Sequence, residues 1–168
     1  MALALLSSPL LGPVVWFPVA EKLSQHGWTV IMPAAPRVAP RSPTDVMRSI
    51  LAELPADKDL VLIPHSNAGL YVPALSVQRQ VVGSVFVDAG LPANYGRVPL
   101  APPGFLDLLE QKADSDGLLP PWTHWWDEAD IAPLFPNAET RDRVEREQRQ
   151  LPVCYFRESL PVPIGWDV

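Results

Sequence analysis

Short apolar runs alternate with helix-like segments along the first half of the chain. Residues 2–6, 28–32, 60–63 and 81–87 each form a run that ends near Ser, Pro or Asp. Runs of this length, bounded by turn-forming residues, are typical of buried strands. The sequence therefore predicts four strands, the last of which ends at Asp88.

Between these runs, apolar residues recur at helical spacing. Residues 15–26 and 42–54 each place apolar side chains on one face, and Ser42 or Thr44 is suited to cap the second helix. A third helix is expected from the end of the third run to about residue 77. Strands that alternate with helices predict an α/β fold: a mainly parallel sheet of about four strands with helices on both faces.

Beyond residue 90 the pattern changes. Residues 91–103 are rich in proline and are expected to form a loop, as are residues 33–43. A short helix is expected at 103–112 and a charged helix at 138–151, whereas no strand is evident in 151–168. The second half is therefore predicted to be a lid-like helical and proline-rich segment.

Length and composition fit one domain, with a core formed by residues 1–90 and a lid-like segment, 91–168, packed on it. The chain has 168 residues, of which 48% are hydrophobic. A net charge of −6 argues against a nucleic-acid partner, and no apolar run is long enough to predict a membrane span. A single cysteine and the lack of histidine clusters indicate no cofactor and no metal site. The expected compartment is the cytoplasm.

The third apolar run ends in the most informative motif of the chain. It reads Pro64-His65-Ser66-Asn67-Ala68, followed by Gly69. A serine between small residues, at a sharp turn from a buried strand into a helix, is how one enzyme class exposes a nucleophile. The alternative is a small polar residue kept at a structural turn.

This motif, with the order of strands around it, resembles the α/β-hydrolase superfamily. The resemblance covers residues 2–90 and extends more loosely beyond them, and Pro64 departs from the glycine usual at that position. It implies that Ser66 is the nucleophile, that Asp88 is the acid, and that the N–H groups of Leu10 and Asn67 form the oxyanion hole. A capping or turn aspartate is the other interpretation of Asp88.

The general base is not evident in this sequence. The superfamily carries its catalytic histidine after the last strand, and no histidine follows His124 here. His65 adjoins Ser66, but adjacent side chains are expected to diverge. His124, Asp88 and water remain the alternatives for the base. We interpret the chain as a shortened member or a fragment that lacks the first strands and the histidine-bearing C-terminal part.

The segment after residue 90 suggests what the site binds. Trp122, Trp125 and Trp126 are expected to line an apolar substrate pocket over Ser66, or alternatively to complete the core. The predicted function is a serine hydrolase, esterase-like, acting on a small ester or related acyl compound. The alternative is a catalytically inactive protein that binds a small molecule or a partner. The fourth strand is expected to have an exposed edge, which is either covered by the lid-like segment or paired with a second copy in a homodimer.

Overall fold

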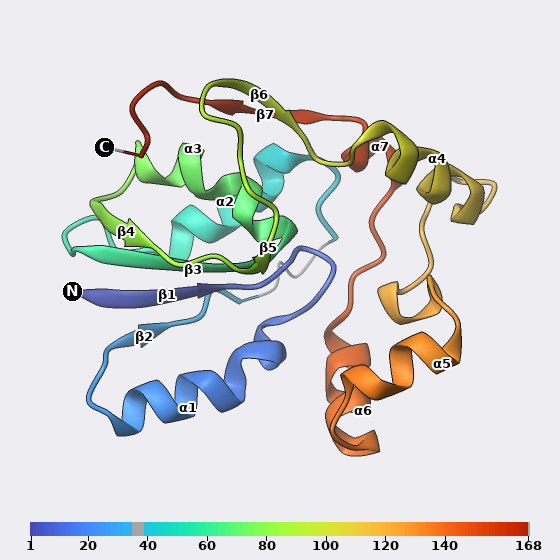
Figure 1. Cartoon of the computed structure of the whole chain (residues 1–168), viewed down its shortest axis with the longest axis horizontal. Coiled ribbons are helices and arrows are strands. Elements are labelled where there is room, and N and C mark those ends of the chain that lie inside the picture. The colour runs from blue at the N-terminus through green and yellow to red at the C-terminus, as the bar shows by residue number, and fades with distance from the viewer. Residues whose placement is uncertain (35–38, 168) are drawn as a thin grey trace.

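The computed structural model describes residues 1–34 and 39–167, and a parallel sheet forms its centre (Figure 1). Within the described residues the strand order is β2-β1-β3-β4, and β5 also pairs with β3; all these pairs are parallel. The strands are β1 (Ala2–Leu6), β2 (Val30–Ile31), β3 (Leu60–Ser66), β4 (Val81–Ser84) and β5 (Val87–Ala89). The predicted mainly parallel sheet is confirmed. The predicted single strand at 81–87 was wrong, because Val85 and Phe86 interrupt it.

Helices cover both faces of this sheet (Figure 1). On one face lie η1 (Pro13–Trp16) and α1 (Phe17–Gln25). The other face carries α2 (Pro43–Glu53), η2 (Asn67–Tyr71) and α3 (Val72–Ser76). The α/β prediction is therefore confirmed.

The residues of β1 are buried because helices cover both faces of the sheet. All five of its residues are buried, and successive side chains point to opposite faces. Leu5 packs with Trp16 and Ala20 on the α1 side, whereas Ala4 and Leu6 belong to the larger cluster on the other side. A strand covered on both faces needs an unbroken apolar run, which is the pattern in the sequence.

A capping box starts α2 at Ser42, which is one of the two N-caps that the sequence allowed. Ser42 Oγ accepts a hydrogen bond from the Asp45 N–H at 3.2 Å, and the Asp45 carboxylate accepts one from the Ser42 N–H at 3.2 Å. The loop expected at 33–43 includes residues 35–38, which lie outside the described part of the chain.

The second half of the chain forms short helices and a separate antiparallel strand pair. Strands β6 (Gly96–Pro99) and β7 (Ser159–Val162) pair with each other. The helices are α4 (Pro103–Lys112), η3 (Trp122–His124), α5 (Glu128–Ile131), η4 (Ala132–Leu134), α6 (Ala138–Glu147) and α7 (Val153–Phe156). The expectation of loops without strands at both places was wrong, because each strand is stabilised by a partner remote in sequence rather than by its own pattern.

The helices of the second half, from α4 to α7 (residues 103–156), are called the helical segment below. This segment lies beyond the carboxyl ends of β1 and β3 (Figure 1).

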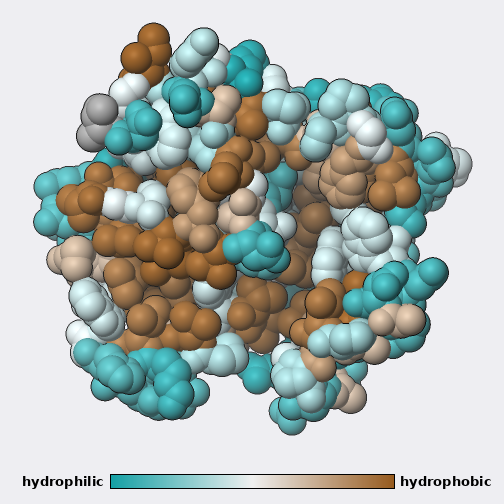
Figure 2. All heavy atoms as spheres, in the orientation of Figure 1, coloured by the Kyte–Doolittle hydropathy of each residue, from teal (hydrophilic) through white to brown (hydrophobic). Residues whose placement is uncertain are grey.

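No helix in the described part of the chain is both long and apolar enough to cross a membrane. At the other boundary, β4 is the edge of the sheet, and Val82 and Val85 near it are 56% and 52% exposed. Figure 2 shows hydrophobic side chains gathered over this side of the sheet. A homodimer through this edge stays a prediction.

Candidate active site

Ser66 occupies a strained turn at the carboxyl end of β3. Its φ of 54° and ψ of −132° lie in a region that a residue with a Cβ rarely adopts. Such a conformation costs about 1–3 kcal/mol and persists only where surrounding contacts enforce it. The turn reverses the chain directly into η2, so that Ser66 lies at the tip of the elbow between strand and helix.

An irregularity in the β3–β5 ladder brings Asp88 to the same place. His65 pairs with Val87 and Ser66 pairs with Ala89, so Asp88 is the extra residue of a bulge. Asp88 has a φ of 42°, which aspartate tolerates better than most residues. Bulges commonly redirect a side chain beside a functional site. Here the bulge puts the Asp88 carboxylate on the same cavities as Ser66.

Two glycines allow the elbow and the end of β5 to approach closely. A Cβ at Gly69 would lie 2.2 Å from the Gly90 carbonyl oxygen, which is too close for any residue other than glycine at position 69. The Gly90 N–H in turn donates to the Ser66 carbonyl oxygen at 2.9 Å. The position of Ser66 is therefore set mainly by backbone contacts.

The two backbone groups predicted to bind an oxyanion differ in availability. Asn67 begins η2, and the first N–H groups of a helix lack partners within that helix. The Leu10 N–H instead donates to Ser8 Oγ at 3.3 Å, a long bond that competes with any ligand. Both residues line the larger of two cavities at Ser66.

A chain of buried side-chain hydrogen bonds holds Asn67 from the second half of the molecule. Tyr155 OH donates to Asn67 Oδ1 at 3.0 Å, and Tyr71 OH lies 2.6 Å from Tyr155 OH, to which it therefore donates. Asn67 Nδ2 donates to the Leu100 carbonyl oxygen at 3.1 Å. Burial raises the pKa of both tyrosines, so both hydroxyls keep their protons. Sequence reasoning missed this network.

Ser66 and Asp88 line two cavities, one of about 550 Å³ and one of about 340 Å³. Figure 2 shows a hollow between the sheet and the helical segment, with hydrophobic side chains along it. Both volumes are in the range of small-molecule sites, although the smaller one is near the lower limit.

The structure brings together only some of the residues that the sequence singled out. Trp122 lines both cavities and Trp125 lines the larger one, whereas Trp126 lines neither and is 41% exposed. His124 is exposed and lines neither cavity. Of the three alternatives for a base, only Asp88 is a side chain on a cavity with Ser66.

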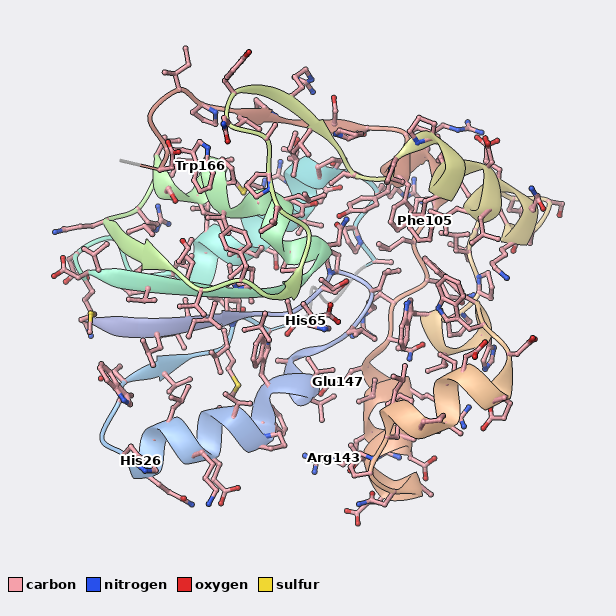
Figure 3. All side chains as sticks on the ribbon, viewed as in Figure 1. His26, His65, Phe105, Arg143, Glu147 and Trp166 are labelled. Carbon is pink, nitrogen blue, oxygen red and sulfur yellow. The ribbon has the colours of Figure 1, made fainter. Side chains whose placement is uncertain are left out.

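His65 lies at the end of β3, facing the loop after β1 (Figure 3), and it lines the smaller cavity with Ser66 and Asp88. Its ring packs edge-on against Trp16, with ring centroids 6.1 Å apart, and its Nδ1 is buried without a hydrogen-bond partner among residues 1–34 and 39–167. Burial lowers the pKa of His65, and the charge of Asp88 opposes this only in part. His65 is therefore neutral at pH 7.

Comparison with known proteins finds a likeness in structure only. No family model and no curated protein sequence matches the chain. Among solved structures it is similar to an extracellular α/β-hydrolase from a Paenibacillus species, with a TM-score of 0.68 and 18% identity. The match covers 96% of this chain and 71% of that one. That hydrolase is described as sharing structural and functional homology with tobacco salicylic acid binding protein 2.

Proposed function

We propose, from the premise that the chain has an α/β-hydrolase-like fold, that it is a serine hydrolase that cleaves a small ester through Ser66. The observation that carries the proposal is the strained turn at Ser66, which opens on two cavities beside a carboxylate. Strain of this kind at the end of a central strand favours a role for the side chain that it displays.

The proposed reaction has two matched steps. Ser66 Oγ attacks the ester carbonyl carbon, its proton passes to Asp88 directly or through one water, and the carbonyl electron pair moves onto oxygen. The Asn67 N–H, and the Leu10 N–H once released from Ser8, stabilise that oxyanion. The electron pair on the oxyanion then re-forms the carbonyl, the bond from the carbonyl carbon to the alcohol oxygen breaks, and the leaving alkoxide takes the proton from Asp88. Water repeats the sequence on the acyl-serine, which frees the acid and restores Ser66.

The test is Ser66-dependent hydrolysis and labelling by a fluorophosphonate probe. Ser66→Ala is expected to lower ester hydrolysis at least about 1,000-fold and to abolish labelling. Asp88→Asn is expected to lower kcat about 100-fold, as the loss of a general base does. Ser115→Ala, in an exposed turn, is the matched control and should behave as wild type. Equal labelling of wild type and Ser66→Ala would overturn the proposal.

A second candidate is a binding protein that does not turn its ligand over. The hydrogen bond from the Leu10 N–H to Ser8 Oγ favours it, because that donor is already occupied. Esters that bind in equilibrium dialysis and are recovered unchanged after long incubation would distinguish this function from hydrolysis.

A further inference from the structure

The two cavities at Ser66 meet along a shared wall. Four residues, Leu10, Ser66, Asp88 and Trp122, line both of them. Ser66 therefore stands where the cavities adjoin, so that a ligand attacked by its Oγ has room to extend in two directions.

The larger cavity has a rigid aromatic wall. The Trp125 ring lies 6.2 Å from the ring of Phe105 and 6.2 Å from that of Phe156, measured between centroids. Trp125 Nε1 donates to the Pro120 carbonyl oxygen at 2.8 Å, so its one polar atom is satisfied within the protein. Tilted and edge-on rings of this kind favour contact with a further ring.

The smaller cavity has a different lining. Its apolar wall combines the aliphatic Leu11, Val15, Leu134 and Val144, from both halves of the chain, with Phe135 and the shared Trp122, and these described residues form no cluster of three contacting rings. At about 340 Å³ it is also well below the larger cavity in volume. These features suit a compact aliphatic group.

Neither cavity offers a positively charged partner for an anion. Among their lining residues, all in the described part of the chain, there is no lysine or arginine, and Asp88 is the only acidic residue. His65, on the smaller cavity, is held neutral by its burial. A carboxylate or phosphate on a ligand would lose water without a compensating ion pair, next to a like charge.

We infer that the site takes an uncharged ester with an aromatic half in the larger cavity and a compact aliphatic half in the smaller one. This inference rests on the proposed function, because it describes the substrate of the same Ser66. It goes beyond that function by assigning each half of the ester to its own cavity and by excluding anionic esters.

Two exposed leucines allow each cavity to be filled separately without disturbing the core. Leu91 lines the larger cavity and is 72% exposed; Leu134 lines the smaller cavity and is 60% exposed. The esters are naphthyl acetate, with bulk in its aromatic half, and phenyl hexanoate, with bulk in its aliphatic half. Leu91→Trp is expected to lower kcat/KM at least about tenfold for naphthyl acetate and less than about threefold for phenyl hexanoate. Leu134→Trp is expected to show the reverse.

The charge requirement is tested with a matched pair on wild type. The KM for 4-acetoxybenzoate should exceed that for its methyl ester at least about tenfold. Equal effects of the two tryptophan variants on both esters, or equal KM values for the matched pair, would overturn the inference. Hydrolysis that persists unchanged in Ser66→Ala would instead overturn the proposed function, and the inference with it.

Discussion

The two halves of the molecule support the candidate site in different ways. In residues 1–90 the support is backbone: β3 pairs with three neighbouring strands, and the Gly90 N–H bonds the Ser66 carbonyl oxygen. In residues 91–168 it is mainly side chain, through Tyr155 to Asn67 and through Glu147, whose carboxylate accepts from the Val14 N–H at 2.9 Å. Figure 3 shows Glu147 on the helical segment opposite the first half.

This difference separates what is fixed from what can vary. A Cβ at position 69 would lie 2.2 Å from the Gly90 carbonyl oxygen, so the elbow has no room for a residue larger than glycine there. A side-chain hydrogen bond from the second half, in contrast, contributes only about 1 kcal/mol net and can be replaced at a modest cost. The first half therefore determines where Ser66 is, and the second half determines what surrounds it. Four predictions test this division.

Gly69→Ala should have the largest effect, because its Cβ would collide with the Gly90 carbonyl oxygen. We expect a loss of about 2–4 kcal/mol in the free energy of unfolding, measured in urea. Gly104→Ala in α4 is the control: a Cβ there meets nothing within 4 Å. The control should be unchanged or more stable by up to about 1 kcal/mol. Similar losses in both variants would contradict the steric argument.

Tyr155→Phe should destabilise the protein by about 1–3 kcal/mol, because it leaves the buried Tyr71 hydroxyl without an acceptor and Asn67 Oδ1 without a donor. Tyr71→Phe should cost less, since the bond from Tyr155 to Asn67 remains. Urea unfolding of both variants measures the difference. A larger loss in Tyr71→Phe would contradict the central place of Tyr155 in this network.

Glu147→Gln should lower stability by about 0.5–1 kcal/mol, because the amide oxygen still accepts from the Val14 N–H but without charge assistance. Asp142→Asn, exposed on the same helix, removes an equal charge as the control and should change stability less. Thermal unfolding in low salt compares the two. A greater loss in Asp142→Asn would show that helix charge, not the contact with η1, governs the effect.

The smallest effect should be the pH dependence contributed by His65. Because burial lowers its folded pKa below 6.5, the unfolded state binds more protons at mildly acidic pH. Stability is then full above about pH 6.5 and falls as pH decreases toward the folded pKa. The difference in unfolding free energy between pH 7.5 and pH 5 should be smaller in His65→Gln than in wild type. An unchanged difference would assign the pH dependence to other groups.

The first half of the fold was predictable because its elements depend on local patterns. The unbroken apolar run at Ala2–Leu6 indicates a strand covered on both faces, and Ser42 or Thr44 before a helical pattern indicates a helix start. Strands β6 and β7 carry no such pattern. Arg97 Nε donates to Ser159 Oγ at 2.7 Å across 62 positions of sequence, a contact that no local window reveals.

The residues of the candidate site also differ in whether a local sequence pattern reveals them. Ser66 and Asn67 follow from one continuous motif, and Asp88 follows from the end of the adjacent strand. Tyr155 was not predictable, because its partners lie 84 and 88 positions away. His65, which was expected to diverge from Ser66, lines the smaller cavity with it.

The hydrogen bond from Tyr155 to Asn67 also has a consequence for the order of folding. It closes a loop of 88 positions, and contacts of such separation form late, since their entropic cost comes before their gain. The parallel sheet and its turn can assemble while the last part of the chain is still unfolded. On refolding, signals from the sheet should therefore recover before any property that depends on Asn67, and the site reaches its final form only when α7 docks.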